Sequence, residues 1–425
     1  MARELRVYLD GAAAGTLHQS TQGNTTFRYD DEYRRARPAP TPLSLSMPLT
    51  RTEHPNKVVL PFLQGLLPDS PTKLEQLARE HHTSVRNAFG LLAHVGRDSA
   101  GAVQVLPPGE GSSDAATRQG DITRLSDADV GEVIADLVAH SDTWGQQRAE
   151  MHWSLPGAQP KVALFRFDDG TWGTPNDSTP TTHILKPAVP PYTDHDVNEH
   201  VTMAAARLLG LAVADHELLS TDRGDRVFVS KRYDRRKVAG RWSRLHQEDL
   251  CQALSVAPDR KYQLDGGPGV NQVAALFDTL ADPRDAADSR RRFFDALVFN
   301  VSAACTDAHA KNFSMLLVGN RATLAPLYDV GTHAPYPSRE PLRSAMKVDD
   351  EYALDAIGRP ELLKAAARLR ISADVAEARV TFLRANLAGA FADAAAATTG
   401  SPEVAEYAAV VADSVARRVA SRGWA

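Results

Sequence analysis

Short apolar runs separated by turn residues dominate the beginning of the chain. The runs lie at residues 5–9, about 14–17 and 25–29, and Asp-Gly and Gly-Asn pairs separate them. Such pairs join neighbouring antiparallel strands, because glycine and asparagine accept the backbone angles that tight turns need. The pattern therefore predicts a small antiparallel sheet in this part of the chain.

Serine residues mark the positions where several helices are expected to begin. Ser70, which is followed by a proline, supplies an N-cap for a helix near 71–81. Ser126 begins a capping-box pattern before a helix over 127–140, whose apolar residues recur at helical spacing. Ser401, again followed by a proline, opens the final helix of an alanine-rich C-terminal region.

The middle of the chain alternates between strands and one amphipathic helix. The helix is predicted over 195–209, where apolar residues follow the spacing of one helix face. Strands are predicted over 161–167, 182–188, 213–219 and 226–233, with a turn at Asp222–Asp225 between the last two.

Beyond about residue 245 the pattern becomes mostly helical. A strand-rich lobe followed by a helical lobe is the outline of a bilobal α+β kinase, although other α+β proteins share this outline. We expect a small N-terminal β-rich subdomain and an all-helical C-terminal lobe. The predicted boundaries are an N-terminal subdomain at 1–108, a linker and helix at 109–150, an ATP-binding small lobe at 151–245, and a large lobe with the catalytic loop at 246–425. The linker is the small, polar stretch 109–120.

Composition points to an ordinary globular protein of the cytoplasm. The 425 residues are 43% hydrophobic and 24% charged, and the net charge of −5 offers no large positive field for nucleic acid. The two cysteines, Cys251 and Cys305, cannot form a disulfide framework, which fits a reducing compartment. The sequence begins without a signal-peptide pattern and contains no apolar stretch near 18 residues, so no membrane contact is expected.

The segment TDAHAKN in the helical half carries the most informative chemistry. Asp307 and Asn312 are five positions apart, the separation of the base and the metal-binding asparagine in a kinase catalytic loop. Apolar strands at 313–318 and 322–327 would form a hairpin that returns Asp329 beside this loop. Each residue alone is typical of an ordinary loop, but the joint pattern favours phosphoryl transfer. Carboxylate and amide oxygens at Asn312 and Asp329 would suit Mg²⁺.

Histidines near this segment raise the alternative of a zinc site. His309 and His333 could act as ligands, but no cysteine or second close histidine accompanies them. We therefore expect a hydrogen-bonding role for His309.

Two further segments have the order of a kinase small lobe. The small-residue loop from Ser154 to Lys161 runs into a strand and could present backbone N–H groups to phosphates, although an ordinary turn would read the same way. Lys186 ends the next strand and Glu199 lies on the helix after it, as in a kinase whose strand lysine is held by a helix carboxylate. An exposed pair of this kind would contribute only about 0–1 kcal/mol to stability, so catalysis is the better reason for it.

The strand end at Val229–Asp234 stands where the hinge between two kinase lobes is expected. Backbone groups there could bind adenine, and Asp234 could reach the ribose. The basic run 235–237 follows, for which a solvated hairpin is the preferred interpretation over contact with nucleic acid.

Taken together, these motifs resemble the HipA family of bacterial toxin–antitoxin kinases. The resemblance covers about residues 5–335. The segments that carry it are Pro42–Pro48, Phe62–Pro68, Gly96–Ala102, Ser154–Lys161, Thr181–Lys186, Asn198-Glu199, Lys231–Arg235, His246–Leu254, Lys261-Tyr262, Gly266–Pro268, Thr306–Ser314 and Leu324–Val330.

The resemblance implies a serine/threonine kinase with a fold similar to the phosphoinositide kinases, using ATP and Mg²⁺. It implies that Asp307 is the catalytic base, aided by His309, and that Asn312 and Asp329 bind Mg²⁺. The residues it implies for nucleotide binding are Ser154, Pro156, Gly157, Ala158, Gln159, Pro160, Lys161, Lys186, Glu199, Lys231, Arg232, Tyr233, Asp234, Lys311 and Tyr328. Lys231 stands where family members often carry glutamate, so its backbone is the expected adenine contact.

The resemblance also implies regulation and partners. Ser154 falls on the family's autophosphorylation position, where added negative charge should expel the phosphate-binding loop. A small helix-turn-helix antitoxin similar to HipB is the expected partner, with operator DNA contacted mainly through it. The expected substrate is a component of translation such as an aminoacyl-tRNA synthetase. A non-catalytic co-repressor of the antitoxin and a small-molecule kinase remain as alternatives.

Overall fold

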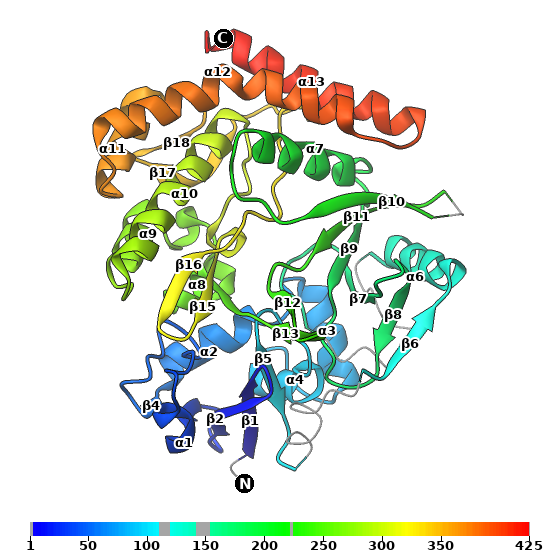
Figure 1. Ribbon diagram of the computed structural model, residues 1–425, viewed down its shortest axis with the longest axis vertical. Helices are drawn as coiled ribbons and strands as arrows, with labels where there is room; N and C mark the ends of the chain where they lie inside the picture. Colours follow the sequence, from blue (N-terminus) through cyan, green and yellow to red (C-terminus); the bar gives the residue numbers. More distant parts are fainter. Residues whose placement is uncertain (1–2, 110–119, 142–153, 222–223, 425) are drawn as a thin grey trace.

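The computed structural model describes residues 3–109, 120–141, 154–221 and 224–424. Figure 1 shows the N-terminal strands at one end of the molecule and the two last helices at the other, with the small lobe beside the middle. Helices and sheets are mixed, so the α+β class predicted from the sequence is confirmed. Nowhere in the described ranges does a helix combine the length and the apolar character that crossing a membrane requires.

The N-terminal region folds around a five-stranded antiparallel sheet with the order β4-β3-β2-β1-β5. Its strands are β1 (Arg3–Leu9), β2 (Ala12–Gln19), β3 (Thr25–Tyr29), β4 (Glu53–His54) and β5 (Val103–Leu106). The first three are the antiparallel strands that the alternation of apolar runs and turns predicted. The return of β5 to the edge of β1, from almost a hundred residues later, depends on tertiary packing.

Four helices belong to this region, namely α1 (Asp31–Arg35), α2 (Asn56–Gly65), α3 (Pro71–Glu80) and α4 (Ala88–Val95). The predicted helix near 71–81 is α3, and the Ser70 hydroxyl accepts a hydrogen bond from the backbone N–H of Lys73 as an N-cap should. Phe27 and Phe62 are fully buried in the core between sheet and helices, which makes the region a separately packed unit.

The small lobe is a six-stranded sheet with the order β10-β11-β9-β7-β8-β6. Its strands are β6 (Ile122–Leu125), β7 (Val162–Arg166), β8 (Trp172–Pro175), β9 (His183–Pro187), β10 (His216–Ser220) and β11 (Arg226–Lys231). Helix α6 (Asp127–Ala139) begins with the predicted capping box and packs against the sheet, whereas α7 (His195–Leu208) packs against both β11 and the large lobe. Of the predicted turn at 222–225 and linker at 109–120, residues 222–223 and 110–119 lie outside the described residues.

The large lobe is built mainly from helices. They are α8 (Leu250–Ala253), α9 (Val270–Asp278), α10 (Pro283–Ser302), α11 (Arg359–Arg368), α12 (Ala373–Ala397) and α13 (Pro402–Ser421). Figure 1 shows α12 and α13 lying side by side across the end of the molecule, with α7 of the small lobe beneath them. This contact brings the helix that carries Glu199 into the core of the large lobe.

The large lobe is not all-helical as the sequence pattern suggested. It also contains a three-stranded sheet of β14 (His246–Asp249), β15 (Ser314–Val318) and β16 (Arg321–Leu324), and a hairpin of β17 (Arg343–Val348) and β18 (Glu351–Ala353). The pairing of β14 with β15 joins segments more than sixty residues apart, so local pattern could not reveal it. The predicted hairpin over 313–327 is the β15–β16 pair.

A buried group of charged side chains, the Asp98 cluster, joins the N-terminal region to the small lobe. It consists of Asp98 and Asp234 with Arg232, Arg235 and Arg244. The Asp98 carboxylate accepts hydrogen bonds from all three guanidinium groups at 2.9–3.3 Å. Burial would raise the pKa of Asp98, but the arginines outweigh it and hold that pKa far below its ordinary value.

The Asp98 cluster changes the interpretation of the basic run at 235–237. Arg236 and Lys237 are exposed on the hairpin of β12 (Arg235–Val238) and β13 (Arg241–Arg244), as expected for a solvated hairpin. Arg235 is instead fully buried against Asp98. Its charge is therefore committed to the fold.

Candidate active site

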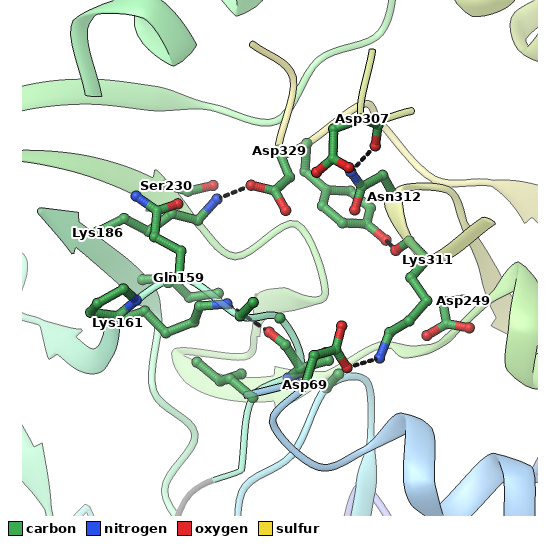
Figure 2. Close-up of a pocket in the computed structure, with 18 of the residues that line it drawn as sticks. Asp69, Gln159, Lys161, Lys186, Ser230, Asp249, Asp307, Lys311, Asn312 and Asp329 are labelled. Atoms are coloured by element: carbon green, nitrogen blue, oxygen red, sulfur yellow. Dashed lines mark hydrogen bonds and ion pairs between the residues drawn. The ribbon is translucent and has the colours of Figure 1, made fainter. Parts of the chain in front are cut away.

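A cavity of about 660 Å³ lies where the small lobe, the large lobe and the N-terminal region meet. Figure 2 shows that charged side chains from all three regions point into it. Of the site residues predicted from the sequence, all but Glu199 and Ser154 line it, and Ser154 is next in the chain to the lining residue Leu155. The cavity therefore collects side chains that are widely separated in the chain.

The predicted catalytic loop follows the long helix α10 and ends in the short 3₁₀ turn Ala310–Asn312. The side-chain amide of Asn312 donates to the backbone oxygen of Asp307 at 2.7 Å, and the backbone N–H of His309 donates to the same oxygen at 2.8 Å. These two bonds close the loop upon itself. The Asp307 side chain is left 64% exposed at the edge of the cavity.

Asp329 reaches the same cavity through a backbone that the small lobe helps to hold. Leu327 exchanges backbone hydrogen bonds with Ala212 and Ala214 at 2.8 and 2.9 Å, which fastens the segment before Asp329 to the small lobe. Asp329 itself has φ of 58°, a left-handed conformation that aspartate and asparagine tolerate better than most residues. This turn aims its carboxylate towards Lys186 (Figure 2).

Lys186 connects the two lobes through its ammonium group. It donates to Glu199 Oε1 at 2.9 Å and to Asp329 Oδ1 at 2.6 Å. Burial would raise the pKa of Asp329, but Lys186 and then Lys161 outweigh it and keep the carboxylate ionised. The lysine–glutamate pair predicted from order along the chain is therefore present, and it is buried.

The predicted phosphate loop, residues 154–161, is held in place by the N-terminal region. The Ser154 hydroxyl donates to the backbone oxygen of Leu66 at 2.7 Å, and the Gly157 oxygen accepts from the backbone N–H of Asp69 at 3.1 Å. Gly157 has φ of 108°, and a Cβ there would lie 2.2 Å from Lys161 Nζ, so glycine is required. The shape of the loop therefore depends on contacts with Leu66 and Asp69, which are distant from it in the sequence.

Lys161 lies beneath this loop, with its ammonium group donating to the Pro156 oxygen at 2.7 Å. Burial, together with the nearby positive charge of Lys186, lowers the pKa of Lys161 to about 8. An anion placed in the cavity would restore its full charge. Gln159 lies at the other side of the loop and donates to the Pro187 oxygen at 3.3 Å.

The expected adenine end of the cavity is lined by aromatic side chains. The rings of Tyr233 and Tyr328 lie 5.5 Å apart, and the Tyr233 hydroxyl donates to Gln247. Lys231 also lines the cavity, but its side chain is half-exposed and its ammonium lies 3.6 Å from Asp215. This geometry is consistent with a backbone contact at Lys231, which stays a prediction.

The side chains of Arg232 and Asp234 bond to each other, although both residues were predicted to bind nucleotide. Both line the cavity, yet the Asp234 carboxylate accepts from Arg232 at 2.9–3.1 Å and from the Gly101 N–H at 2.7 Å. The proposed reach of Asp234 to a ribose therefore conflicts with its place in the Asp98 cluster. Both residues were predicted as nucleotide contacts from the motif at 231–235, and the same motif supplies charged side chains to the buried Asp98 cluster.

His309 is buried beside Asp307 rather than bonded to it through its ring. Its Nε2 lies 3.9 Å from Asp307 Oδ1, beyond hydrogen-bond distance, and its Nδ1 has no partner within the described ranges. Burial lowers the pKa of its imidazole, which favours the neutral ring. No group of three or more potential metal-ligating His, Cys, Asp or Glu residues occurs in the described part of the chain.

Sequence reasoning missed two side chains that contact the catalytic loop. Asp69 of the N-terminal region accepts from Lys311 and, at 3.3 Å, from Lys261 (Figure 2 labels Asp69 and Lys311). Burial would raise the pKa of Asp69, but Lys311 and Lys261 lower it further than burial raises it. Tyr262 donates its phenolic hydroxyl to Asp307. The only signal in the sequence was that Asp69 follows the family segment Phe62–Pro68 and that Tyr262 belongs to the segment Lys261-Tyr262.

Two family models match this chain. The HipA N-terminal domain matches residues 5–106, and the HipA-like C-terminal domain matches residues 153–396. Together they span both the N-terminal region and the two lobes around the cavity.

Curated relatives cover most of the chain. A protein of Sinorhizobium fredii named as a kinase, Y4mE, is 34% identical over 354 residues, which is 83% of this chain and 82% of that protein. The serine/threonine-protein kinase toxin HipA of Shewanella oneidensis is 29% identical over 328 residues, which is 74% of this chain and 72% of that protein.

A solved structure shares the whole architecture. It is the complex of HipA, HipB and operator DNA from Shewanella oneidensis, in which the matched chain superimposes with a TM-score of 0.82 at 24% identity. The match covers 98% of this chain and 96% of the other. The likeness extends the agreement in fold from the cavity to both ends of the molecule.

Proposed function

The chain belongs to the HipA family and is a serine/threonine-protein kinase, and from this premise we propose that its cavity binds ATP and delivers the γ-phosphoryl group to a protein hydroxyl. The single observation that supports this best is the ammonium of Lys186, which bridges Glu199 of the small lobe and Asp329 of the large lobe. Phosphoryl transfer relies on positioning and charge compensation, and this bridge is the part that a kinase needs before nucleotide arrives.

The phosphates are proposed to lie between the phosphate loop and Lys186. Lys161 and Lys186 line the cavity side by side, and Gly157 leaves space above the Lys161 ammonium. Both positive charges would face the phosphate oxygens in a site largely shielded from water, where such interactions are strongest. The aromatic pair Tyr233 and Tyr328 would enclose the adenine.

The oxygen atoms of Asn312 and Asp329 suit a magnesium ion. The Asn312 amide nitrogen donates to the Asp307 backbone oxygen, which leaves the amide oxygen free to face the cavity. Lys186 contacts Asp329 Oδ1, and no hydrogen-bond donor among the described residues contacts Oδ2. Hard oxygen donors with room for water and phosphate are the set that Mg²⁺ prefers. When bound, the ion would supply positive charge to the phosphate oxygens.

Asp307 is proposed to orient the acceptor hydroxyl and take its proton. Its carboxylate is exposed at the mouth of the cavity, so an incoming protein side chain could reach it. As the acceptor oxygen forms its bond to the γ-phosphorus, the bond to ADP breaks and the proton passes to Asp307. An exposed base of this kind favours a protein acceptor over a small molecule enclosed by the cleft.

We further propose that Ser154 is a site of autophosphorylation that switches the kinase off. Its side chain is 1% exposed and bonded to the Leu66 oxygen, so a phosphate there could not remain in its present position. The added charge would have to leave with the loop, which would remove Gly157 and its neighbours from the nucleotide.

The biological role that fits the family is that of a toxin. The Shewanella relative is named a toxin, and the matched structure contains HipA together with HipB and operator DNA. By analogy, a helix-turn-helix antitoxin would neutralise this kinase, and a translation component would be its substrate. The rival role is that of a weakly catalytic co-repressor.

The test of the proposed function compares the full-length chain with its Asp307→Asn variant. Incubation with radiolabelled ATP and Mg²⁺ should label wild type or an added acceptor, whereas the variant should transfer no measurable phosphate. Nucleotide binding and thermal unfolding should change little, because the Asp307 side chain contributes few packing contacts. Equal transfer by both proteins would refute the role of Asp307.

Mass spectrometry after the same incubation separates the kinase from the co-repressor. Phosphate on Ser154 of wild type supports the enzyme and its switch. A tight complex with antitoxin and DNA, formed without phosphate on any protein, would favour the co-repressor.

A further inference from the structure

One motif of the sequence has no role in the proposed reaction so far. Lys261 and Tyr262 lie between the 3₁₀ turns Pro258–Arg260 and Gln263–Asp265, and Gly266–Pro268 follows the second turn. The Lys261 oxygen accepts from the backbone N–H of Ala310 at 3.2 Å. The segment is therefore attached directly to the catalytic loop.

Tyr262 contacts the proposed base and its neighbour at once. Its phenolic hydroxyl donates to Asp307 Oδ1. Its ring meets the ring of His309 edge to face, with centroids 4.9 Å apart. No other hydrogen-bond donor to the Asp307 carboxylate occurs in the described part of the chain, and Oδ2 is not engaged.

Backbone hydrogen bonds hold the turn around Tyr262. The Tyr262 oxygen accepts from the backbone N–H groups of Asp265 and Gly267 at 3.1 and 2.9 Å. A Cβ at Gly267 would lie 2.0 Å from the Arg260 oxygen, so only glycine permits this turn. The neighbouring Gln263 side chain is fixed by the backbone N–H of Lys347 at 2.7 Å.

Lys261 extends the support to the N-terminal region. Its ammonium lies 5.7 Å from the centroid of the Tyr262 ring and 3.3 Å from Asp69 Oδ2. Tyr262 is thus held on one side by the catalytic loop and on the other by a lysine that the N-terminal region positions.

We propose that Tyr262 is a positioning residue, whose hydroxyl holds Asp307 Oδ1 so that Oδ2 faces the acceptor hydroxyl. The proposal rests on the function proposed above. An exposed aspartate with no second contact would rotate freely, and each rotation away from the acceptor would lower the fraction of productive complexes. In the reaction, the acceptor proton passes to Oδ2, the acceptor oxygen bonds to the γ-phosphorus, and ADP leaves.

The opposite role is a phenol that competes with the acceptor for the same carboxylate. In that case Tyr262 would occupy the acceptor position and slow the reaction. The two roles predict changes of opposite sign when the hydroxyl is removed, so a single conservative variant separates them.

The experiment uses the full-length chain with Tyr262→Phe, which keeps the ring against His309 and removes only the hydroxyl. Initial rates with Mg²⁺, ATP and myelin basic protein as a generic acceptor should show kcat lower by about tenfold, since effects of one misplaced group are commonly of this size or larger. KM for ATP should stay within about twofold, because Tyr262 is not expected to contact the nucleotide.

The matched control is Tyr33→Phe, which removes a phenolic hydrogen bond to the Thr41 oxygen at 2.7 Å in the N-terminal region, away from the cavity. Its kcat should equal that of wild type. The increase in Tm produced by Mg²⁺ and ATP should be the same for wild type and Tyr262→Phe. A structural role would alter this increase, whereas a positioning role would leave it.

Four outcomes would overturn the proposal. A Tyr262→Phe variant with unchanged kcat would show that the hydroxyl does not matter, and a faster variant would assign it to competition with the acceptor. A slower variant that also loses the nucleotide-induced Tm increase would make the contact merely structural. If wild type itself transfers no phosphate while Asp307→Asn binds nucleotide equally well, the proposed function fails and this inference falls with it.

Discussion

The Asp98 cluster and the cleft around Lys186 are built from the same kinds of side chain, yet they differ in what their charges can bind. Both join distant segments through buried carboxylates and cations. The Asp98 cluster uses arginines, whose planar forks occupy Asp98 and Asp234 from several directions. The cleft uses lysines, which are single point charges.

The two groups differ in how completely their charges are paired and in whether those charges face the cavity. Asp98, Arg235 and Arg244 do not line the cavity formed by the described residues, and their charges are paired with one another. Lys186 and Asp329 also pair, but the pair opens onto the cavity. Buried charge by itself therefore does not mark a functional site. A functional site is marked by charged groups that can still bind a ligand and that face a cavity able to hold it.

The largest expected effect comes from Asp329→Asn. Phosphate transfer should fall by a factor on the order of 10³, because the charge of the carboxylate that is proposed to hold Mg²⁺ and that pairs with Lys186 is lost. The fold should survive, since asparagine accepts the left-handed backbone of this position. Radiolabelled transfer and thermal unfolding measure the two effects.

The matched control is Asp349→Asn, which changes another left-handed aspartate, with φ of 57°, that pairs with Lys364 at 2.8 Å outside the cavity. Its transfer rate should equal that of wild type. Equal losses in both variants would mean that the cleft carboxylate has no special role.

The next largest effect is expected in the Asp98 cluster, where a substitution should lower the free energy of unfolding without changing the rate of phosphate transfer. Arg235→Met leaves Asp98 with an unpaired share of its buried charge, which typically costs about 3–5 kcal/mol of unfolding free energy. Arg236→Met, one residue away and exposed, should change it by less than about 0.5 kcal/mol. Denaturant unfolding measures both, and activity per folded molecule should stay constant.

A smaller effect concerns Glu248, a buried carboxyl that has no cation partner among the described residues. Its Oε1 accepts from the Leu45 N–H at 2.7 Å, and burial raises the pKa of Glu248 to about 8. Between the ordinary pKa of an unfolded glutamate and about pH 8, the unfolded chain ionises first, so stability falls as pH rises. Glu248→Gln removes this penalty.

The variant should therefore gain about 1–3 kcal/mol over wild type at pH 8 and little at pH 4.5, in line with the differential cost of burying a charge. Thermal unfolding across this pH range measures the gain. The exposed Glu53→Gln should follow the wild-type pH profile, and a Glu248→Gln gain independent of pH would contradict the assignment.

The smallest expected effect comes from Lys231→Ala. The side chain is half-exposed, and its 3.6 Å pair with Asp215 is worth little in water. KM for ATP should change by less than about twofold, because only the backbone is expected to contact adenine. Lys186→Ala, on the neighbouring strand, should abolish transfer, and a comparable loss at Lys231 would place its side chain in the site.

Several parts of the fold and the site could be predicted from short stretches of sequence. The strands β1–β3 and the starts of α3 and α6 follow from turn pairs and caps, which act over three or four residues. Asp307 and Asn312 lie on one short loop, and one hairpin leads from it to Asp329. Their convergence was therefore within reach of spacing arguments.

Other parts could not be predicted, because they depend on docking between distant segments. Asp69 meets Lys311 across 242 positions, and Tyr262 meets Asp307 across 45. Asp234 was predicted from its motif as a ribose contact, and its carboxylate pairs with Arg232 and Arg235. Arg235 was predicted to lie on a solvated hairpin, but it is buried against Asp98, whereas Arg236 and Lys237 are exposed. The strands of the large lobe likewise pair residues far apart.

By itself the sequence determined where elements begin, which residues could carry phosphoryl-transfer chemistry, and to which family the chain is similar. Only the tertiary structure decided which of its charges remain available for a ligand and which are consumed by the fold. The physical reason is that burial and pairing set the state of an ionisable group, and both are properties of its surroundings in space. Neighbours along the chain supply few of those surroundings.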